Sequence, residues 1–200
     1  MDKFIRISAW MNILGAVLLV FSWISLGVLN YASIVNGQFG EIFIGSPNIA
    51  ALILLFASML LLSAGLFGLF IFMNDFRIYA ITGFFCFFVG LIWFTSIQYF
   101  ETFILPYLAS HDPNSFDIIM KGKDILSFTG FVGSAVPWTA GIILFGIALL
   151  KCKTFSSTVS IVWIIGGALQ LFGALPIRTI GLLLTSFSIV YFGLKMRKQA

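Results

Sequence analysis

Residues 101–130, ETFILPYLASHDPNSFDIIMKGKDILSFTG, divide the chain into two strongly apolar halves. They hold four of the seven acidic residues, two of the eleven basic residues and the single histidine, which is the composition of a segment in water. Three apolar runs precede this stretch and three follow it, each close to the length needed to cross a lipid bilayer. We therefore expect 101–130 to be an outer loop between two sets of three helices.

The composition excludes a water-soluble globule. Of the 200 residues, 60% are hydrophobic and 9% are charged, whereas a soluble domain has about 25% charged residues to cover its surface. The net charge of +4 does not indicate nucleic-acid binding, because the basic residues stand in small groups at the ends of apolar runs. A nucleic-acid footprint would be a continuous basic stripe. The sequence predicts an all-α membrane protein in a lipid bilayer.

The apolar runs predict a bundle of six transmembrane helices that forms a single domain, residues 1–200. The first run extends about 34 Å as an α-helix, enough for a hydrocarbon core of about 30 Å. The apolar region of a signal peptide has only about 7–15 residues, so we expect this longer run to be retained as a span. The predicted spans are 7–29, 48–73, 78–100, 131–150, 158–172 and 177–194.

The basic residues predict the orientation of this bundle. With six spans, eight of them lie on the side of the termini and three on the other side, where they are Lys121, Lys123 and Arg178. Since basic residues favour the cytoplasmic side, we expect both termini to be cytoplasmic. The small size and short loops suggest a prokaryotic cell membrane. A five-span alternative would make 158–194 one broken helix, and the internal Pro176 argues against it.

Three connecting segments carry local signals. Asn36-Gly37 favours a turn in a small hairpin or an interfacial segment between the first two spans. Asp75 is a candidate cap for the third span. The residues from Ser115 onward favour a short amphipathic helix on the membrane surface.

Small residues mark faces on which helices can approach closely. Ala64 and Gly68 are four residues apart in the second span, and Gly166 and Gly167 lie in the fifth. These faces predict close contacts, including contacts to a second subunit in a homo- or hetero-oligomer.

Catalytic and metal-binding motifs are missing from the sequence. No predicted span has a charge near its middle, so a proton pump with a carboxylate at mid-depth is not expected. His111 and Asp112, with Asp117 and Glu101, lack the spacing of metal ligands. We expect no cofactor, no metal and no convergent catalytic set.

The strongest candidate site is a group of polar residues at the outer ends of the spans. Gln98 and Glu101 close the third span and share a helix face, Trp138 lies in the fourth, Gln170 ends the fifth and Arg178 opens the sixth. A guanidinium there can clamp a carboxylate or phosphate, with Glu101 as its resting partner. The alternative is that Arg178 only reaches headgroups at the membrane surface.

Three classes of function follow. The first is a protein that binds or moves a small amphiphilic or lipid-like ligand from the outer leaflet. The second is a structural or accessory subunit of a membrane complex. The third is a lipid-modifying enzyme, which requires Glu101 or His111 beside a pocket. The absence of a catalytic set favours the first two, and the sequence does not separate them.

Overall fold

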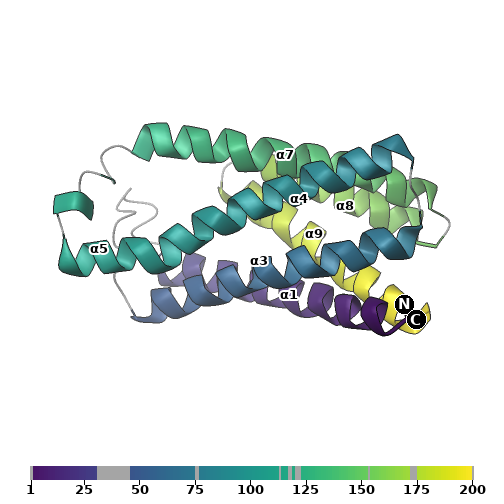
Figure 1. Cartoon of the computed structure of the whole chain (residues 1–200), viewed down its shortest axis with the longest axis horizontal. Coiled ribbons are helices and arrows are strands. Elements are labelled where there is room, and N and C mark those ends of the chain that lie inside the picture. Colours follow the sequence, from purple (N-terminus) through teal and green to yellow (C-terminus); the bar gives the residue numbers. More distant parts are fainter. Residues whose placement is uncertain are drawn as a thin grey trace.

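The computed structural model describes residues 2–30, 46–74, 77–112, 114–116, 119, 123–152, 154–171 and 175–199. The described part of the chain is all-helical (Figure 1). Its elements are α1 (Asp2–Leu29), α3 (Ser46–Met73), α4 (Ile78–Tyr99), the π-helical turn η2 (Phe100–Ile104), α5 (Leu105–His111), α7 (Lys123–Lys151), α8 (Ser157–Leu171) and α9 (Leu175–Gln199).

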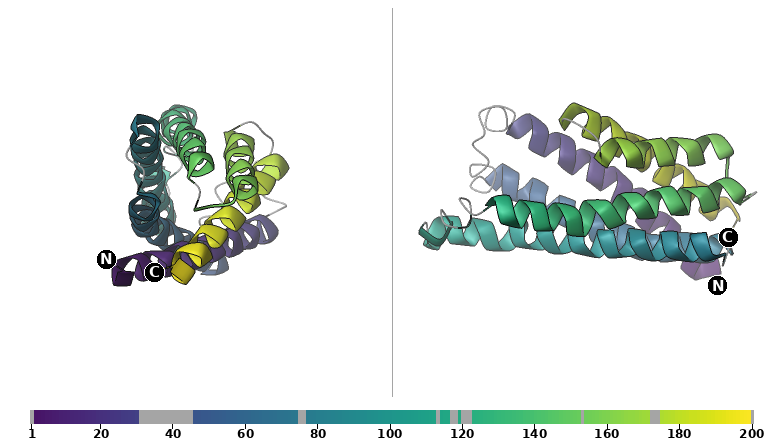
Figure 2. Two further views of the ribbon diagram at one scale, coloured as in Figure 1. Left: turned by 90° about the vertical axis from the view of Figure 1, so that its right-hand side faces the viewer. Right: turned by 90° about the horizontal axis from the view of Figure 1, so that it is seen from above.

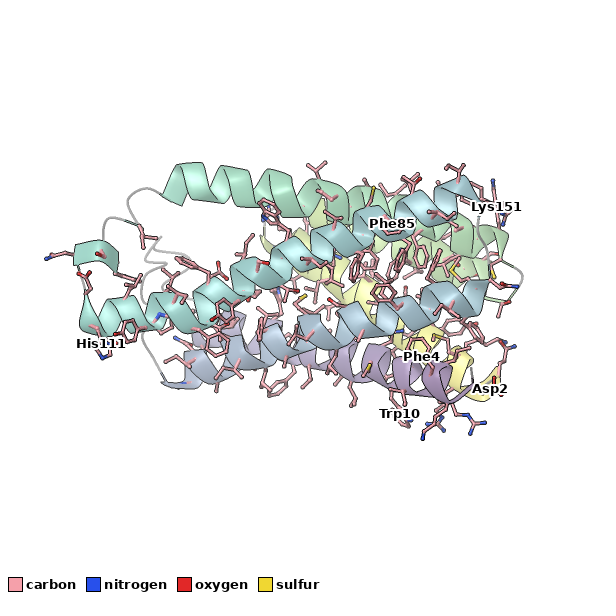
Figure 3. All side chains as sticks on the ribbon, in the orientation of Figure 1. Asp2, Phe4, Trp10, Phe85, His111 and Lys151 are labelled. Atoms are coloured by element: carbon pink, nitrogen blue, oxygen red, sulfur yellow. The ribbon has the colours of Figure 1, made fainter. Side chains whose placement is uncertain are left out.

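Within the described ranges, four helical segments are long and apolar enough to cross a membrane. They are Asp2–Leu29, Pro47–Met73, Ile78–His111 and Pro176–Gln199, and shorter apolar helices cover Ala135–Lys151 and Ser157–Gln170. Large apolar side chains also cover the outside of the bundle, for example Phe85 at 58% exposure and Trp10 at 46% (Figure 3). An exterior as apolar as the interior is compatible with a helical membrane protein.

The helices pack in pairs. α1 lies against α3 and α9, α4 lies against α7, and α8 lies between α7 and α9. Both termini lie at one end of the bundle, whereas α5 reaches the opposite end (Figure 1). The adjoining ends of α8 and α9 stop short of the end that α5 and α7 reach (Figure 2). With 15 residues, α8 is about 22 Å long.

Glycines allow close packing between α4 and α7. A Cβ added at Gly83 or Gly90 of α4 would fall on the backbone nitrogen of Phe145 or Trp138 of α7. A Cβ added at Gly141 of α7 would fall on the backbone nitrogen of Phe87. Small residues allow such backbone contact, which supplies the packing that holds helices together in lipid.

The small-residue face of α3 is displaced by one residue from the expected one. Gly68 packs against Ser8 of α1, as expected. The second small residue of α3 that meets α1 is Gly65, whose carbonyl accepts a 2.9 Å hydrogen bond from Nδ2 of Asn12. Ala64 is exposed. The preference for Gly65 follows from the contact itself, because Asn12 occupies the space that a side chain there would fill.

The glycines of α8 also make their contacts inside the chain. Gly166 lies against Gly181 and Thr185 of α9, and Gly167 lies against Ile142 of α7. These two glycines and Gly68 are therefore covered within one protomer, and they are not a lipid-facing stripe.

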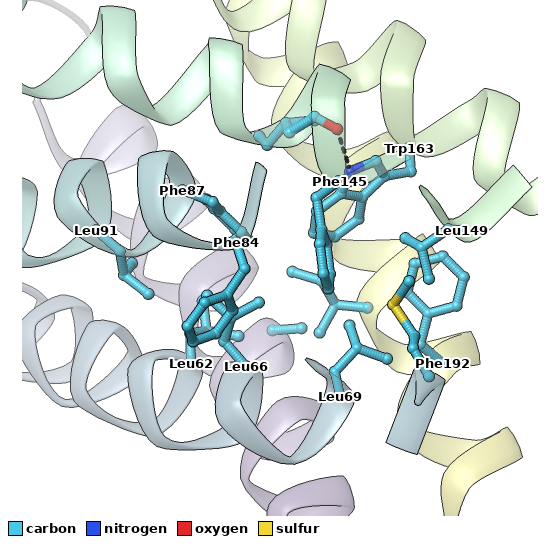
Figure 4. Close-up of a cluster of buried hydrophobic side chains, with 14 of the residues drawn as sticks. Leu62, Leu66, Leu69, Phe84, Phe87, Leu91, Phe145, Leu149, Trp163 and Phe192 are labelled. Carbon is cyan, nitrogen blue, oxygen red and sulfur yellow. Dashed lines mark hydrogen bonds between the residues drawn. The ribbon is translucent and has the colours of Figure 1, made fainter. Parts of the chain in front are cut away.

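The core lies where α3, α4, α7, α8 and α9 meet, around Trp163 (Figure 4). This side chain is 1% exposed, and its Nε1 donates a 2.9 Å hydrogen bond to the carbonyl of Ile142 on α7. Its ring contacts those of Phe87 and Phe192 with centroids 5.5 and 5.7 Å apart. One indole thus joins three helices.

The expected loop over 101–130 is wrong at both of its ends. Helix continues from α4 through η2 and α5 to His111, and α7 begins at Lys123. The residues after Tyr99 remain mostly apolar, so the third helical segment runs on past residue 100. Pro106 does not stop it because it stands in the first turn of α5, where a proline is tolerated.

The signals in the connecting segments fall largely on residues outside the described part. This applies to the Asn36-Gly37 turn and to the cap at Asp75. Of the helix expected from Ser115 onward, residues 117, 118 and 120–122 lie outside the described part, and the residues from Lys123 belong to α7. Asn74 is described and ends α3 with φ of 49°, a left-handed conformation that asparagine tolerates.

Candidate functional site

A groove of about 470 Å³ opens between α1 and α9. Its walls are apolar and include Val17, Phe21 and Ile24 of α1 and Leu183, Phe187 and Val190 of α9. Side-chain size explains it. Ala16 and Ser186 line the groove and are small and buried, whereas Phe21 and Phe187 project outward on either side.

The two helices also touch near both ends of the groove. Toward the termini, Gly193 of α9 lies against Ile13 and the carbonyl of Ala9. At the other end, Nε1 of Trp23 donates a 3.1 Å hydrogen bond to Oγ1 of Thr179. These contacts hold α1 and α9 together and leave an apolar recess between them.

Ser186 places a polar group in this recess. Its side chain is 3% exposed, and its hydroxyl has no hydrogen-bond partner among the described residues. Neighbouring hydroxyls behave differently, since those of Ser22 and Ser188 donate to carbonyls four residues earlier in their own helices. Buried polar groups usually have a partner, so this hydroxyl, whose oxygen is itself buried, is an exception among the described residues.

Arg178 lies next to the Trp23–Thr179 end of the groove. It stands in the first turn of α9 and is exposed. It precedes Ser186 by eight residues, about 12 Å along the helix. This places a cation and a buried hydroxyl at two depths along the same pair of helices.

The structure brings Gln98 and Glu101 together, as their shared face predicts. Nε2 of Gln98 donates a 2.7 Å hydrogen bond to Oε2 of Glu101. Glu101 lies on η2, which packs against α3, α4 and α5, whereas Arg178 opens α9 beside α8 and α1. Glu101 is thus paired with Gln98, and its pairing with Arg178 stays a prediction.

The other two predicted site residues lie elsewhere in the bundle. Trp138 packs between the rings of Phe87 and Phe94 of α4, with centroids 4.8 and 6.2 Å away. Nε2 of Gln170 donates a 2.9 Å hydrogen bond to Oγ1 of Thr185, which joins α8 to α9. The five predicted residues do not form one pocket, and the groove residues of α1 and α9 were not predicted at all. Their pairing is a tertiary contact that leaves no motif.

His111 is remote from the groove. It ends α5, is exposed, and stacks on Tyr107 with ring centroids 4.3 Å apart. After it, the Ser115 hydroxyl and backbone N–H hold the pKa of the exposed Asp112 carboxyl below its ordinary value. Within the described ranges, no three His, Cys, Asp or Glu residues are grouped to hold a metal ion.

Comparisons with protein-family models, with curated proteins and with solved structures found no match to this chain.

Proposed function

We propose that this chain is a multi-pass protein of a cell membrane that binds an amphiphilic, lipid-like molecule in the groove between α1 and α9. The observation that supports this proposal is the groove itself. Its volume of about 470 Å³ falls within the range of about 300–1,000 Å³ typical of small-molecule sites. Its apolar walls suit a hydrocarbon chain.

Charge at the end of the groove favours an anionic headgroup. Arg178 opens α9 beyond the Trp23–Thr179 hydrogen bond, and a guanidinium binds carboxylate or phosphate oxygens in a bidentate manner. A molecule with its chain in the groove would extend its head toward Arg178.

The binding test compares two valine variants of the purified protein. Val17 and Val89 are similarly exposed, at 54% and 49%, but only Val17 lines the groove. Val17→Trp is expected to weaken binding of a fluorescent anionic lysophospholipid at least about 10-fold, because the indole fills the recess. Val89→Trp on α4 is the matched control and is expected to bind like the parent.

Arg178 variants test the headgroup separately. Arg178→Ala should weaken binding of the anionic lysophospholipid more than binding of a zwitterionic one. Arg178→Lys should restore only part of the lost affinity, since lysine cannot make a bidentate contact. If Val17→Trp and both Arg178 variants bind as the parent does, the groove is not the site.

We further propose six membrane crossings with both termini in the cytoplasm. The positions of both termini at one end of the bundle suit an even number of crossings (Figure 1). The excess of basic residues at the helix ends on that side suits a cytoplasmic location. The short helix α8 would be accommodated by local thinning of the bilayer.

Cysteine labelling in cells tests this topology. In a variant with Cys86 and Cys152 replaced by alanine, His111→Cys is expected to react with a membrane-impermeant maleimide from outside. Lys198→Cys is expected to react only after permeabilisation. Labelling of position 111 from the cytoplasmic side alone would contradict the proposed orientation.

A further inference from the structure

A second polar site lies on the side of the bundle away from the groove. Gln98 and Glu101 belong to the helical segment Ile78–His111, which is long and apolar enough to cross a membrane. Helix α3, which packs against η2, contains no Lys, Arg or His over Ser46–Met73. An ionisable residue inside such a segment is costly to place in lipid and indicates function.

The helix changes its geometry at this point. Phe100–Ile104 form a π-helical turn, and the N–H of Leu105 donates to the carbonyl of Phe100, five residues earlier. Pro106 follows and has no N–H for the carbonyl of Thr102. Single π-helical turns are frequent at functional sites, and broken helices in membrane proteins provide oxygen ligands for ions.

The side chains at this turn offer oxygen atoms, one of which has no partner. Gln98 is 5% exposed, and its Oε1 is buried with no hydrogen-bond partner among the residues that the structure describes. Its Nε2 donates a hydrogen bond to the Glu101 carboxylate. An ionised carboxylate only accepts hydrogen bonds, so the amide must turn its N–H groups toward it. Thr102, on the next position of the same turn, is buried and directs its hydroxyl to the carbonyl of Leu52 at 3.3 Å.

We propose that Gln98, Glu101 and Thr102 form a binding site for a monovalent metal cation, with sodium as the ion to test. The single carboxylate balances one positive charge, whereas a divalent ion would leave a net charge in an apolar surrounding. Oxygen atoms are the ligands that hard cations prefer. A proton on Glu101 is the competing occupant, because a protonated carboxyl has an O–H that can donate to Gln98 Oε1 while it accepts from Nε2. This site is independent of the α1–α9 groove.

Thermal unfolding of the full chain in detergent tests the proposal. At constant ionic strength, replacing choline chloride with sodium chloride is expected to raise the unfolding midpoint, by about 5–10 °C when sodium reaches about 100 times its Kd. Glu101→Gln and Gln98→Leu are expected to abolish this rise. Gln170→Leu, which removes a glutamine bonded to Thr185 at a different pair of helices, is expected to retain it.

Three results would contradict the cation site. One is an equal unfolding midpoint of the parent protein in sodium chloride and in choline chloride. This comparison does not depend on whether any variant folds. Another is a full sodium response in Gln98→Leu. The third is stabilisation by acid in choline chloride with no added effect of sodium, which would make Glu101 a proton site. Val17→Trp should keep the sodium response, so this proposal and the groove proposal fail separately.

Discussion

Replacing Gly141 by leucine is expected to abolish recovery of folded, monodisperse protein. A Cβ at this position would fall on the backbone nitrogen of Phe87, and the neighbouring atoms of the same residue are as close. Overpacking of a core side chain costs about 1–3 kcal/mol when neighbours can move, but a helix backbone cannot rotate away as a side chain can. Leucine would therefore separate α4 from α7, and even Gly141→Ala should lower the unfolding midpoint.

The matched control for this prediction is Gly27→Leu. Gly27 also lies in a long apolar helix, but a Cβ there has nothing within 4 Å. This variant is expected to elute from a size-exclusion column and to unfold as the parent does. If Gly141→Leu behaved in the same way, the close contact between α4 and α7 would be wrong.

Trp163→Ala is expected to have the next largest effect on stability. The indole is 1% exposed and joins α8 to α7 and to Phe87 of α4. Removing a buried aromatic side chain costs about 3–5 kcal/mol because the cavity collapses only in part. The carbonyl of Ile142 would also lose its indole hydrogen bond. We expect a fall of roughly 6–20 °C in the unfolding midpoint.

Two further variants separate volume from hydrogen bonding. Trp163→Phe keeps one aromatic ring and loses the Nε1 donor together with part of the indole volume, so it should recover a large part of the stability, since polar contacts between membrane helices contribute about 0.6 kcal/mol on average. Trp10→Ala removes the same residue type at 46% exposure and is expected to change the midpoint little. An equal loss in Trp10→Ala and Trp163→Ala would refute the packing around Trp163.

The glutamate at position 101 shows how far composition can mislead. Polar and acidic residues between 101 and 130 suggested a loop, and Glu101 was assigned to the end of a span. The helix in fact continues to His111, because the residues around Glu101 are apolar and one carboxylate can be held by a glutamine three residues earlier. Side-chain pairing of this kind depends on helix geometry, and residue counts do not contain it.

The sequence by itself determined that the chain is helical and suited to lipid, and it placed most helix boundaries within a few residues. The reason is that apolar content and length act locally, on one helix at a time. Only the tertiary structure decided that Gly65 and not Ala64 meets α1, that Gly141 meets Phe87, and that α1 and α9 enclose a groove around Ala16 and Ser186. When nearly every face of every helix is apolar, hydrophobicity cannot choose the partner, and the choice depends on which side chains are small enough to allow close packing.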